Sequence, residues 1–217
     1  MNGRLLEVLE ERLTRPLPGP MVGSRFEPLP PRARYDLSPP GARQAAVLIL
    51  FYPYEDRWHL PLILRPSGLA DHAGQIGLPG GAAEPGETGR ETAIREFHEE
   101  LGAAGHRIEV LGRLSPIFVA VSNFRVEPWV AATSSRPALA PNPAEVKELL
   151  EVPLAHLMDP ANFGVCRLSG KDRSCTAPHF LWDGHRVWGA TCMILGELVT
   201  ILEECEPWDW LRVCGTS

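Results

Sequence analysis

Five glutamates lie close together between residues 87 and 100, at positions 87, 91, 96, 99 and 100. Carboxylates at helical neighbour spacing repel one another, so their concentration in one segment needs an explanation. One explanation is a solvated acidic face of a helix. The other is a divalent-cation site, because carboxylate oxygens are the hard ligands that Mg²⁺ and Mn²⁺ prefer. The acidic residues alone leave both explanations open.

The surrounding residues predict that this acidic segment is a helix. Thr88 and Glu91 fit a capping box, and Gly102 fits the left-handed position that ends many helices. We therefore expect a helix from about Gly89 to Leu101. Its buried stripe is predicted to hold Ala93, Ile94, Phe97 and Leu101. Glu96, Glu99 and Glu100 are expected together on the broadly opposite side.

The rest of the chain predicts an α+β fold. Residues 45–52 and 58–64 are rich in β-forming residues around a polar break, which indicates a hairpin. Residues 107–119 and 124–133 are again β-rich, residues 161–177 look like a loop, and residues 191–204 have helical periodicity. Strands, one helix, more strands and a closing helix do not form a regular βαβ alternation. We expect a mixed β-sheet sandwiched between helices.

The composition narrows the class of protein. Hydrophobic residues make up 44% of the 217 residues, and the net charge is −6. This charge argues against a broad surface for nucleic acid or anionic membrane, so an anionic substrate needs local help such as a metal ion. The five cysteines match no zinc pattern, and no signal or transit peptide is evident. These features favour reduced thiols and a cytoplasmic location.

The acidic helix lies within a longer pattern that resembles the Nudix box, GX5EX7REUXEEXGU, in which U is a bulky aliphatic residue. The fixed positions of the box are all matched, by Gly81, Glu87, Arg95, Glu96, Glu99, Glu100 and Gly102. Two U positions depart mildly from the pattern, because Phe97 is aromatic and Ala103 is small.

The resemblance implies a Nudix fold that holds Mg²⁺ or Mn²⁺ against a diphosphate linkage. It implies Glu96, Glu99 and Glu100 as metal ligands. The catalytic residues that it implies are Glu87, Arg95, Glu99 and Glu100. Bound cations neutralise phosphate charge and activate water. Glu87 and Arg95 are expected to pair across the motif, and Gly80 and Gly81 to let the backbone approach the site.

Family members differ in the carboxylate that takes the proton from water. Some use a glutamate of the box, and others use an acid on a distant loop. The distant candidates in this chain are Glu127, Glu145 and Glu148. We choose Glu145, which follows the loop at residues 141–144, as the predicted general base. A surface or capping role for Glu145 is the competing interpretation.

Residues 62–81 resemble the segment that marks coenzyme A diphosphatases within this superfamily, roughly LLTxRSxxLRxHxGQxxFPGG. The matches include Arg65, His72, Gln75, Gly80 and Gly81, which become the predicted substrate-binding residues. Arg65 can bind phosphate oxygens in a fork. Ala70 replaces a second arginine of the pattern, which weakens the assignment of the substrate but not of the reaction.

The resemblance implies hydrolysis of coenzyme A or acyl-CoA to 3′,5′-ADP and 4′-phosphopantetheine or its acyl form. One alternative substrate is NADH, ADP-ribose or a nucleoside triphosphate. A non-catalytic module that binds nucleotides or a protein partner is the alternative of another class. We expect an N-terminal helix and proline-rich arm over residues 1–42, the Nudix domain over 43–206 and a tail over 207–217. The predicted partner is a small compound with a diphosphate linkage. We expect no nucleic-acid or membrane partner, and a homodimer is one of the oligomeric states to be tested.

Overall fold

The computed structural model describes residues 3–19, 24–28, 39–68, 74–103, 106–169 and 174–205. Within these residues, the main sheet contains β1 to β8, and a smaller sheet contains β9 to β11. The strands of the main sheet are β1 (Arg43–Tyr54), β2 (Arg57–Leu64), β3 (Ile76–Gly77), β4 (Gly80–Ala82), β5 (Glu109–Arg113), β6 (Ile117–Val119), β7 (Phe124–Ala132) and β8 (Glu148–Pro153). The smaller sheet consists of β9 (Phe163–Ser169), β10 (Ser174–Trp182) and β11 (His185–Trp188). The helices are α1 (Gly3–Leu13), α2 (Gly89–Leu101), α3 (Leu154–Met158), the 3₁₀ turn η1 (Pro160–Asn162) and α4 (Gly189–Glu203).

The predicted hairpin is formed by β1 and β2, which pair antiparallel. Glu55 and Asp56 connect them with positive φ angles of 48° and 55°, the left-handed conformation that a tight hairpin turn requires. β1 also pairs in parallel with β7, which makes the sheet mixed. The α+β class and the mixed sheet between helices are therefore confirmed.

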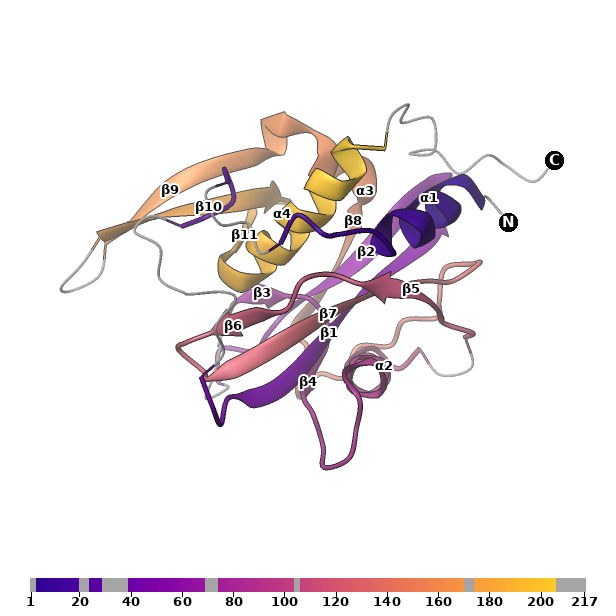
Figure 1. Cartoon of the computed structure of the whole chain (residues 1–217), viewed down its shortest axis with the longest axis horizontal. Coiled ribbons are helices and arrows are strands. Elements are labelled where there is room, and N and C mark those ends of the chain that lie inside the picture. Colours follow the sequence, from indigo (N-terminus) through magenta and orange to yellow (C-terminus); the bar gives the residue numbers. More distant parts are fainter. Residues whose placement is uncertain are drawn as a thin grey trace.

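The sheet is covered on both faces, with α2 on one side and α1, α3 and α4 on the other (Figure 1). Side chains alternate along a strand, and β1 uses both sets. Leu48, Leu50 and Tyr52 face the apolar cluster with α2, whereas Ile49 and Phe51 face the larger cluster with the other helices. A strand that is buried on both faces reads as a continuous apolar run, which explains residues 45–52.

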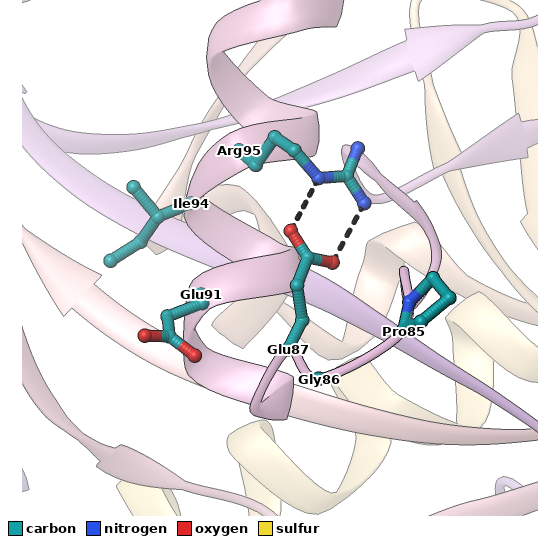
Figure 2. A pocket seen from close by; sticks show the side chains of 6 residues that line it. All are labelled: Pro85, Gly86, Glu87, Glu91, Ile94 and Arg95. Carbon is teal, nitrogen blue, oxygen red and sulfur yellow. Dashed lines mark hydrogen bonds and ion pairs between the residues drawn. The ribbon is translucent and has the colours of Figure 1, made fainter.

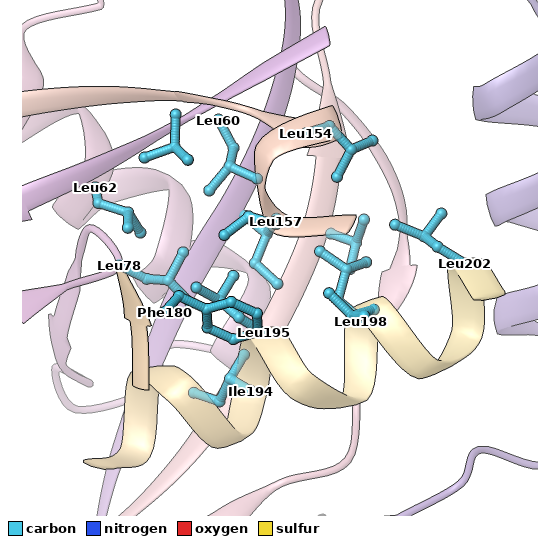
Figure 3. Packing of buried hydrophobic residues seen from close by; sticks show 14 of the residues in the cluster. Leu60, Leu62, Leu78, Leu154, Leu157, Phe180, Ile194, Leu195, Leu198 and Leu202 are labelled. Atoms are coloured by element: carbon cyan, nitrogen blue, oxygen red, sulfur yellow. The ribbon is translucent and has the colours of Figure 1, made fainter. Parts of the chain in front are cut away.

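The larger apolar cluster lies between the sheet and the C-terminal half of the chain (Figure 3). Leu60 and Leu62 of β2 meet Leu157 of α3 and Leu195 of α4, and all four are buried. This packing fixes α4 against the sheet. The helix predicted at residues 191–204 is confirmed by α4, which begins two residues earlier.

The predicted loop at residues 161–177 is wrong. Residues 163–169 and 174–182 pair antiparallel as β9 and β10, and Pro178 lies opposite Val165 in their register. A proline lowers the strand propensity of a segment, and these strands gain their stability from pairing with each other. The β9–β10 ribbon extends beyond the helical layer (Figure 1).

The described part of the predicted N-terminal arm packs into the core of the domain. Leu5 and Leu9 on α1 are fully buried, and so is Phe26. The division of the chain at residues 42 and 43 stays a prediction, and the predicted tail at 207–217 lies outside the described residues. Cys166, Cys192 and Cys205 form no disulfide. Among the helices described here, none combines the length and apolarity that crossing a membrane needs.

Candidate active site

The acidic helix begins and ends where the sequence predicts. Thr88 and Glu91 form both hydrogen bonds of the capping box, and Gly102 ends α2 in the left-handed conformation with φ 63°. Because helix ends leave backbone groups without intrahelical partners, these caps fix the length and direction of the helix. The glutamates on α2 are thereby held at defined positions over the sheet.

The predicted burial pattern of α2 is wrong in two places. Glu100 is buried, with 1% of its surface exposed, whereas Ile94 is only half-buried. Glu100 follows Ala93 by seven residues, which is about 20° short of two full helical turns. It therefore lies on the face that packs against the sheet, beside Ala93 and Phe97, and not on the opposite side.

The buried carboxylate of Glu100 accepts a hydrogen bond from the backbone of β4. The backbone N–H of Gly80 donates to Glu100 Oε2 at 2.8 Å. Gly80 has a φ of 153°, and a side chain there would overlap the backbone of Ala46 and Val47. A side chain at Gly81 would overlap the carboxylate of Glu96. Gly80 thus lets β4 lie close against β1, and Gly81 leaves room for the carboxylate of Glu96.

The loop before β8 brings in Glu145. The N–H groups of Ala140 and Asn142 donate to the last carbonyls of α2, those of Leu101 and Glu100, both at 2.8 Å. The side-chain amide of Asn142 then donates to Glu145 Oε1 at 3.0 Å. This places Glu145 beside the helix. The sequence analysis gave Asn142 no role, although the Asn-Pro that precedes Glu145 by three residues is a signal for a turn.

Glu96, Glu100 and Glu145 converge. Each offers one carboxylate oxygen, and these three atoms all lie within 4.8 Å of one another. Burial raises the pKa of Glu100 to about 7, although Arg65 opposes this effect. Burial also raises the pKa of Glu96 above its ordinary value, and the hydrogen bond from Arg95 offsets only part of the rise. Such a cluster resists ionisation without a cation.

The donor set fits a hard divalent cation. Its members are carboxylate oxygens, the ligands that Mg²⁺ and Mn²⁺ take in proteins. Glu100 Oε1 is buried without a well-aligned hydrogen bond from the described residues, although Arg65 Nη2 lies 3.1 Å away. A buried carboxylate oxygen with unmet bonding capacity is the chemical environment that a metal ion would satisfy.

Arg65 lies at the edge of this acidic cluster. It follows β2 directly, and its backbone pairs with Gln75 and Gly74. Its guanidinium donates to the carbonyl of Gly80 at 2.8 Å and faces Glu100. The position of Arg65 therefore agrees with the predicted contact to phosphate oxygens, and that contact itself stays a prediction.

Arg95 and Glu87 form the predicted pair across the motif (Figure 2). Arg95 Nε and Nη2 donate to the two carboxylate oxygens of Glu87 at 2.7 and 3.1 Å, and the guanidinium also bonds the carbonyl of Ala82. The hydrogen bond from Arg95 lowers the pKa of Glu87 to about 2. The pair ties the loop before α2 to the helix.

Glu99 is not brought into the acidic cluster. Its carboxylate accepts a hydrogen bond from Arg95 at 2.8 Å, and about half of its side chain is exposed. Glu145 takes the third place in the group of converging carboxylates. The assignment of Glu99 as a metal ligand stays a prediction.

The remaining predicted residues divide between the site and its surroundings. Gln75 lines the same cavity as the acidic cluster, whereas His72 lies outside the described residues. The other two candidates for the distant base lie elsewhere. Glu127 pairs with Arg125 on β7, and Glu148 lies near His185. Of the three candidates, Glu145 is the one that the fold brings to the acids of α2.

A cavity of about 510 Å³ opens beside the acidic cluster. Glu96, Glu100, Glu145 and Arg65 form its charged wall. The other residues around it are mostly apolar, and they come from residues 26–28, from β1, β3, β4, β6, β7 and the β6–β7 turn, and from β10 and the start of α4. This volume lies within the range that is typical of sites for small molecules.

The fold is that of a hydrolase family that acts on diphosphate compounds. The NUDIX domain model matches residues 42–165, and the chain belongs to the Nudix family. It is therefore an enzyme of the class that hydrolyses diphosphate bonds in small molecules, a class that generally needs divalent metal ions.

Curated relatives cover most of the chain. The protein named uncharacterized Nudix hydrolase NudL of Photorhabdus laumondii is 31% identical over 179 residues, which are 81% of this chain and 92% of that protein. NudL of Pectobacterium atrosepticum is 35% identical over 161 residues, 72% of this chain and 81% of that protein. The human mitochondrial coenzyme A diphosphatase NUDT8 is 37% identical over 157 residues, 69% of this chain and 65% of that protein.

Proposed function

We propose that the chain hydrolyses the diphosphate linkage of coenzyme A or an acyl-CoA. The observation that carries the proposal is the convergence of Glu96, Glu100 and Glu145 beside Arg65 in one cavity. The segment at residues 62–81 and the similarity to a coenzyme A diphosphatase support this substrate. The products would be 3′,5′-ADP and 4′-phosphopantetheine, or its acyl form.

The proposed cofactor is Mg²⁺ or Mn²⁺, held by Glu96 and Glu100, with Glu99 as the further ligand predicted from the box. When bound, the ion supplies neutralisation of the diphosphate charge and activation of water. A buried carboxylate pair without a cation is costly, because burial disfavours the charged form of both groups. The cation therefore offsets a cost that the fold imposes on the protein itself.

The residues of the chain have separate roles in this proposal. Arg65 binds phosphate oxygens from the charged wall of the cavity. Water forms a bond to one phosphorus atom, the bridging P–O bond of the diphosphate breaks, and Glu145 accepts the proton from the water. Asn142 orients Glu145 through its 3.0 Å hydrogen bond. Glu87 and Arg95 keep the motif in shape.

One observation favours a different diphosphate as the second candidate. Ala70 stands where the coenzyme A pattern has a second arginine, and that arginine would suit the 3′-phosphate that coenzyme A carries in addition to its diphosphate. A substrate without this phosphate does not need the missing charge. NADH, ADP-ribose and nucleoside triphosphates are the compounds to compare.

The test is a comparison of kcat/KM for coenzyme A, NADH, ADP-ribose and deoxynucleoside triphosphates, with Mg²⁺ and with Mn²⁺. We expect a preference for coenzyme A of about tenfold or more, which corresponds to about 1.4 kcal/mol in transition-state stabilisation. EDTA should abolish the activity, and Glu100→Gln should lower it on every substrate. Equal or better hydrolysis of ADP-ribose or NADH would reject coenzyme A as the preferred substrate.

A further inference from the structure

The cavity beside the acidic cluster carries almost all of its charge on one wall. Among the described residues that line it, Arg65 is the single lysine or arginine. Facing the site are apolar side chains that include Phe26, Ile117, Met193 and Ile194. A diphosphate at the acidic wall therefore has an apolar surface next to it, and that surface is poorly suited to a further phosphate group.

Much of this apolar wall comes from outside the matched Nudix domain, which ends at residue 165 and begins at residue 42. Phe26 and Pro28 precede the domain, whereas β10 and the start of α4 follow it. The family domain supplies the acids and part of the apolar surface, including Ile117 and Val121, and the flanking segments supply the rest of that surface. The flanking segments are thus placed to select the group that is attached to the diphosphate.

The wall is built firmly enough to act as a binding surface. The ring of Phe26 packs against Phe163 and Phe180 with centroid distances of 5.1 and 5.7 Å. Gly196 of α4 makes room for it, since a side chain at that position would overlap the ring. Arg25 forms an ion pair with Glu203 at the other end of α4. Aromatic packing and this ion pair hold residues 25–26 against the helix.

Two exposed apolar side chains border the same cavity. Val121 in the β6–β7 turn is 95% exposed, and Trp188, the last residue of β11, is 39% exposed. Single exposed apolar residues are common on protein surfaces. These two lie beside one cavity, which is continuous with the acidic site, so a ligand that enters the site can cover both.

We propose that this apolar wall binds the pantetheine arm and acyl chain of an acyl-CoA, with Val121 and Trp188 as specificity-determining contacts. This inference rests on the proposed function. Coenzyme A carries an anionic nucleotide on one side of its diphosphate and an uncharged arm on the other. Because the described residues of the wall offer apolar area and no cation besides Arg65, the wall suits the uncharged arm, and acylation extends that arm with further apolar surface.

The first test is a series of kcat/KM values for free coenzyme A and for acetyl-, butyryl-, hexanoyl- and octanoyl-CoA. Each fully buried methylene can contribute up to about fourfold, and an exposed rim gives less. We expect octanoyl-CoA to exceed acetyl-CoA by about tenfold, with the gain mainly in KM, because uniform binding of the chain does not raise kcat. Binding in EDTA, measured by calorimetry, should show a similar preference for octanoyl-CoA over coenzyme A.

Val121→Ser and Trp188→Ala should each reduce the ratio of octanoyl-CoA to free coenzyme A hydrolysis by about threefold or more. Val165→Ser is the matched control, because Val165 is 55% exposed on β9 and does not line the cavity. The control should leave the ratio unchanged. Val121 lies on an exposed turn, so its variant keeps the test valid even where Trp188→Ala fails to fold.

The outcomes separate this inference from the proposed function. Hydrolysis of coenzyme A without any dependence on chain length overturns the apolar subsite alone. An equal loss of ratio in Val165→Ser, or no loss in Val121→Ser, overturns it as well. If neither coenzyme A nor any acyl-CoA is hydrolysed while ADP-ribose or NADH is, both the proposed function and this inference fail.

Discussion

At the scale of single residues, the glutamates near α2 differ in their surroundings, and their expected roles differ accordingly. Glu87, Glu96 and Glu99 all accept hydrogen bonds from Arg95, and of these three only Glu96 also converges with Glu100 and Glu145 at the cavity. Glu145 is joined to the cluster by the fold, since it lies 45 residues beyond Glu100 in the sequence. Its role as the general base is the part of the proposed mechanism that a single substitution tests most directly.

Glu145→Gln removes the carboxylate and keeps the size of the side chain. If Glu145 takes the proton from water, kcat should fall by about 10²- to 10⁴-fold. The affinity for Mn²⁺, measured by calorimetry, should change by less than about threefold, whereas Glu96→Gln should weaken it much more.

Glu148→Gln is the matched control for this substitution, because Glu148 is a neighbouring glutamate that lies outside the cluster. It should leave both kcat and Mn²⁺ affinity near the values of the unchanged protein. A loss of metal affinity in Glu145→Gln as large as in Glu96→Gln would show that Glu145 is a ligand and not the base.

At the scale of elements, α4 joins the N-terminal segment to the sheet through one buried carboxylate. Glu197 is 2% exposed and accepts hydrogen bonds from the N–H and hydroxyl of Ser115 at 2.9 and 2.6 Å. The N–H of Gly19 donates to it as well, at 3.2 Å. Burial raises the pKa of Glu197 above its ordinary value, and the bonds from Ser115 offset only part of this effect.

This raised pKa makes the contribution of Glu197 to stability depend on pH. At pH values between the pKa of an ordinary glutamate and the raised pKa of Glu197, the unfolded chain has lost a proton that the folded protein still holds, so the free energy of unfolding falls as pH rises. Glu197→Gln lacks this dependence. Urea unfolding should therefore show that the unchanged protein loses stability relative to Glu197→Gln between pH 5 and pH 8. A difference in unfolding free energy that stays constant over this range would contradict the prediction.

At the scale of the whole molecule, segments on either side of the family domain complete its core. The matched domain spans residues 42–165, yet Leu5, Leu9 and Phe26 lie in the same apolar cluster as α4 and β2. Burial of apolar surface is the main favourable term in folding, so these residues belong energetically to the domain. Helix α1 and the described residues around Phe26 are thus anchored to the domain.

Leu9→Ala tests this contribution. Leu9 is fully buried, and truncation of a buried leucine costs about 2–5 kcal/mol because it removes apolar contacts and leaves a cavity. Urea unfolding should show a loss in this range. Glu7→Ala on the exposed face of α1 is the control and should cost less than about 0.5 kcal/mol. Equal stability of the two variants would show that α1 does not stabilise the domain.

Elements that depend on interactions between neighbours in the chain were predicted correctly from the sequence, whereas strands that depend on pairing between segments were missed. Local signals predicted α2 to the residue, because its caps are formed by neighbours in the chain. They also predicted the β1–β2 hairpin, whose turn lies between two apolar strands. The loop predicted at residues 161–177 is wrong, because β9 and β10 are stabilised by pairing with each other. Pro178 also lowers the apparent strand propensity of β10 in the sequence.

The sequence by itself determined the family, the fold class and the acidic motif, since the spacing of Gly81, Glu87 and Arg95 is a property of the chain. The tertiary structure decided which carboxylates meet. Packing against the sheet buries Glu100, and the hydrogen bonds from residues 140 and 142 to the end of α2 bring Glu145 beside it. It also placed residues from before and after the matched domain around one cavity. Contacts between distant segments depend on how the elements pack, and helical spacing within one segment carries no information about them.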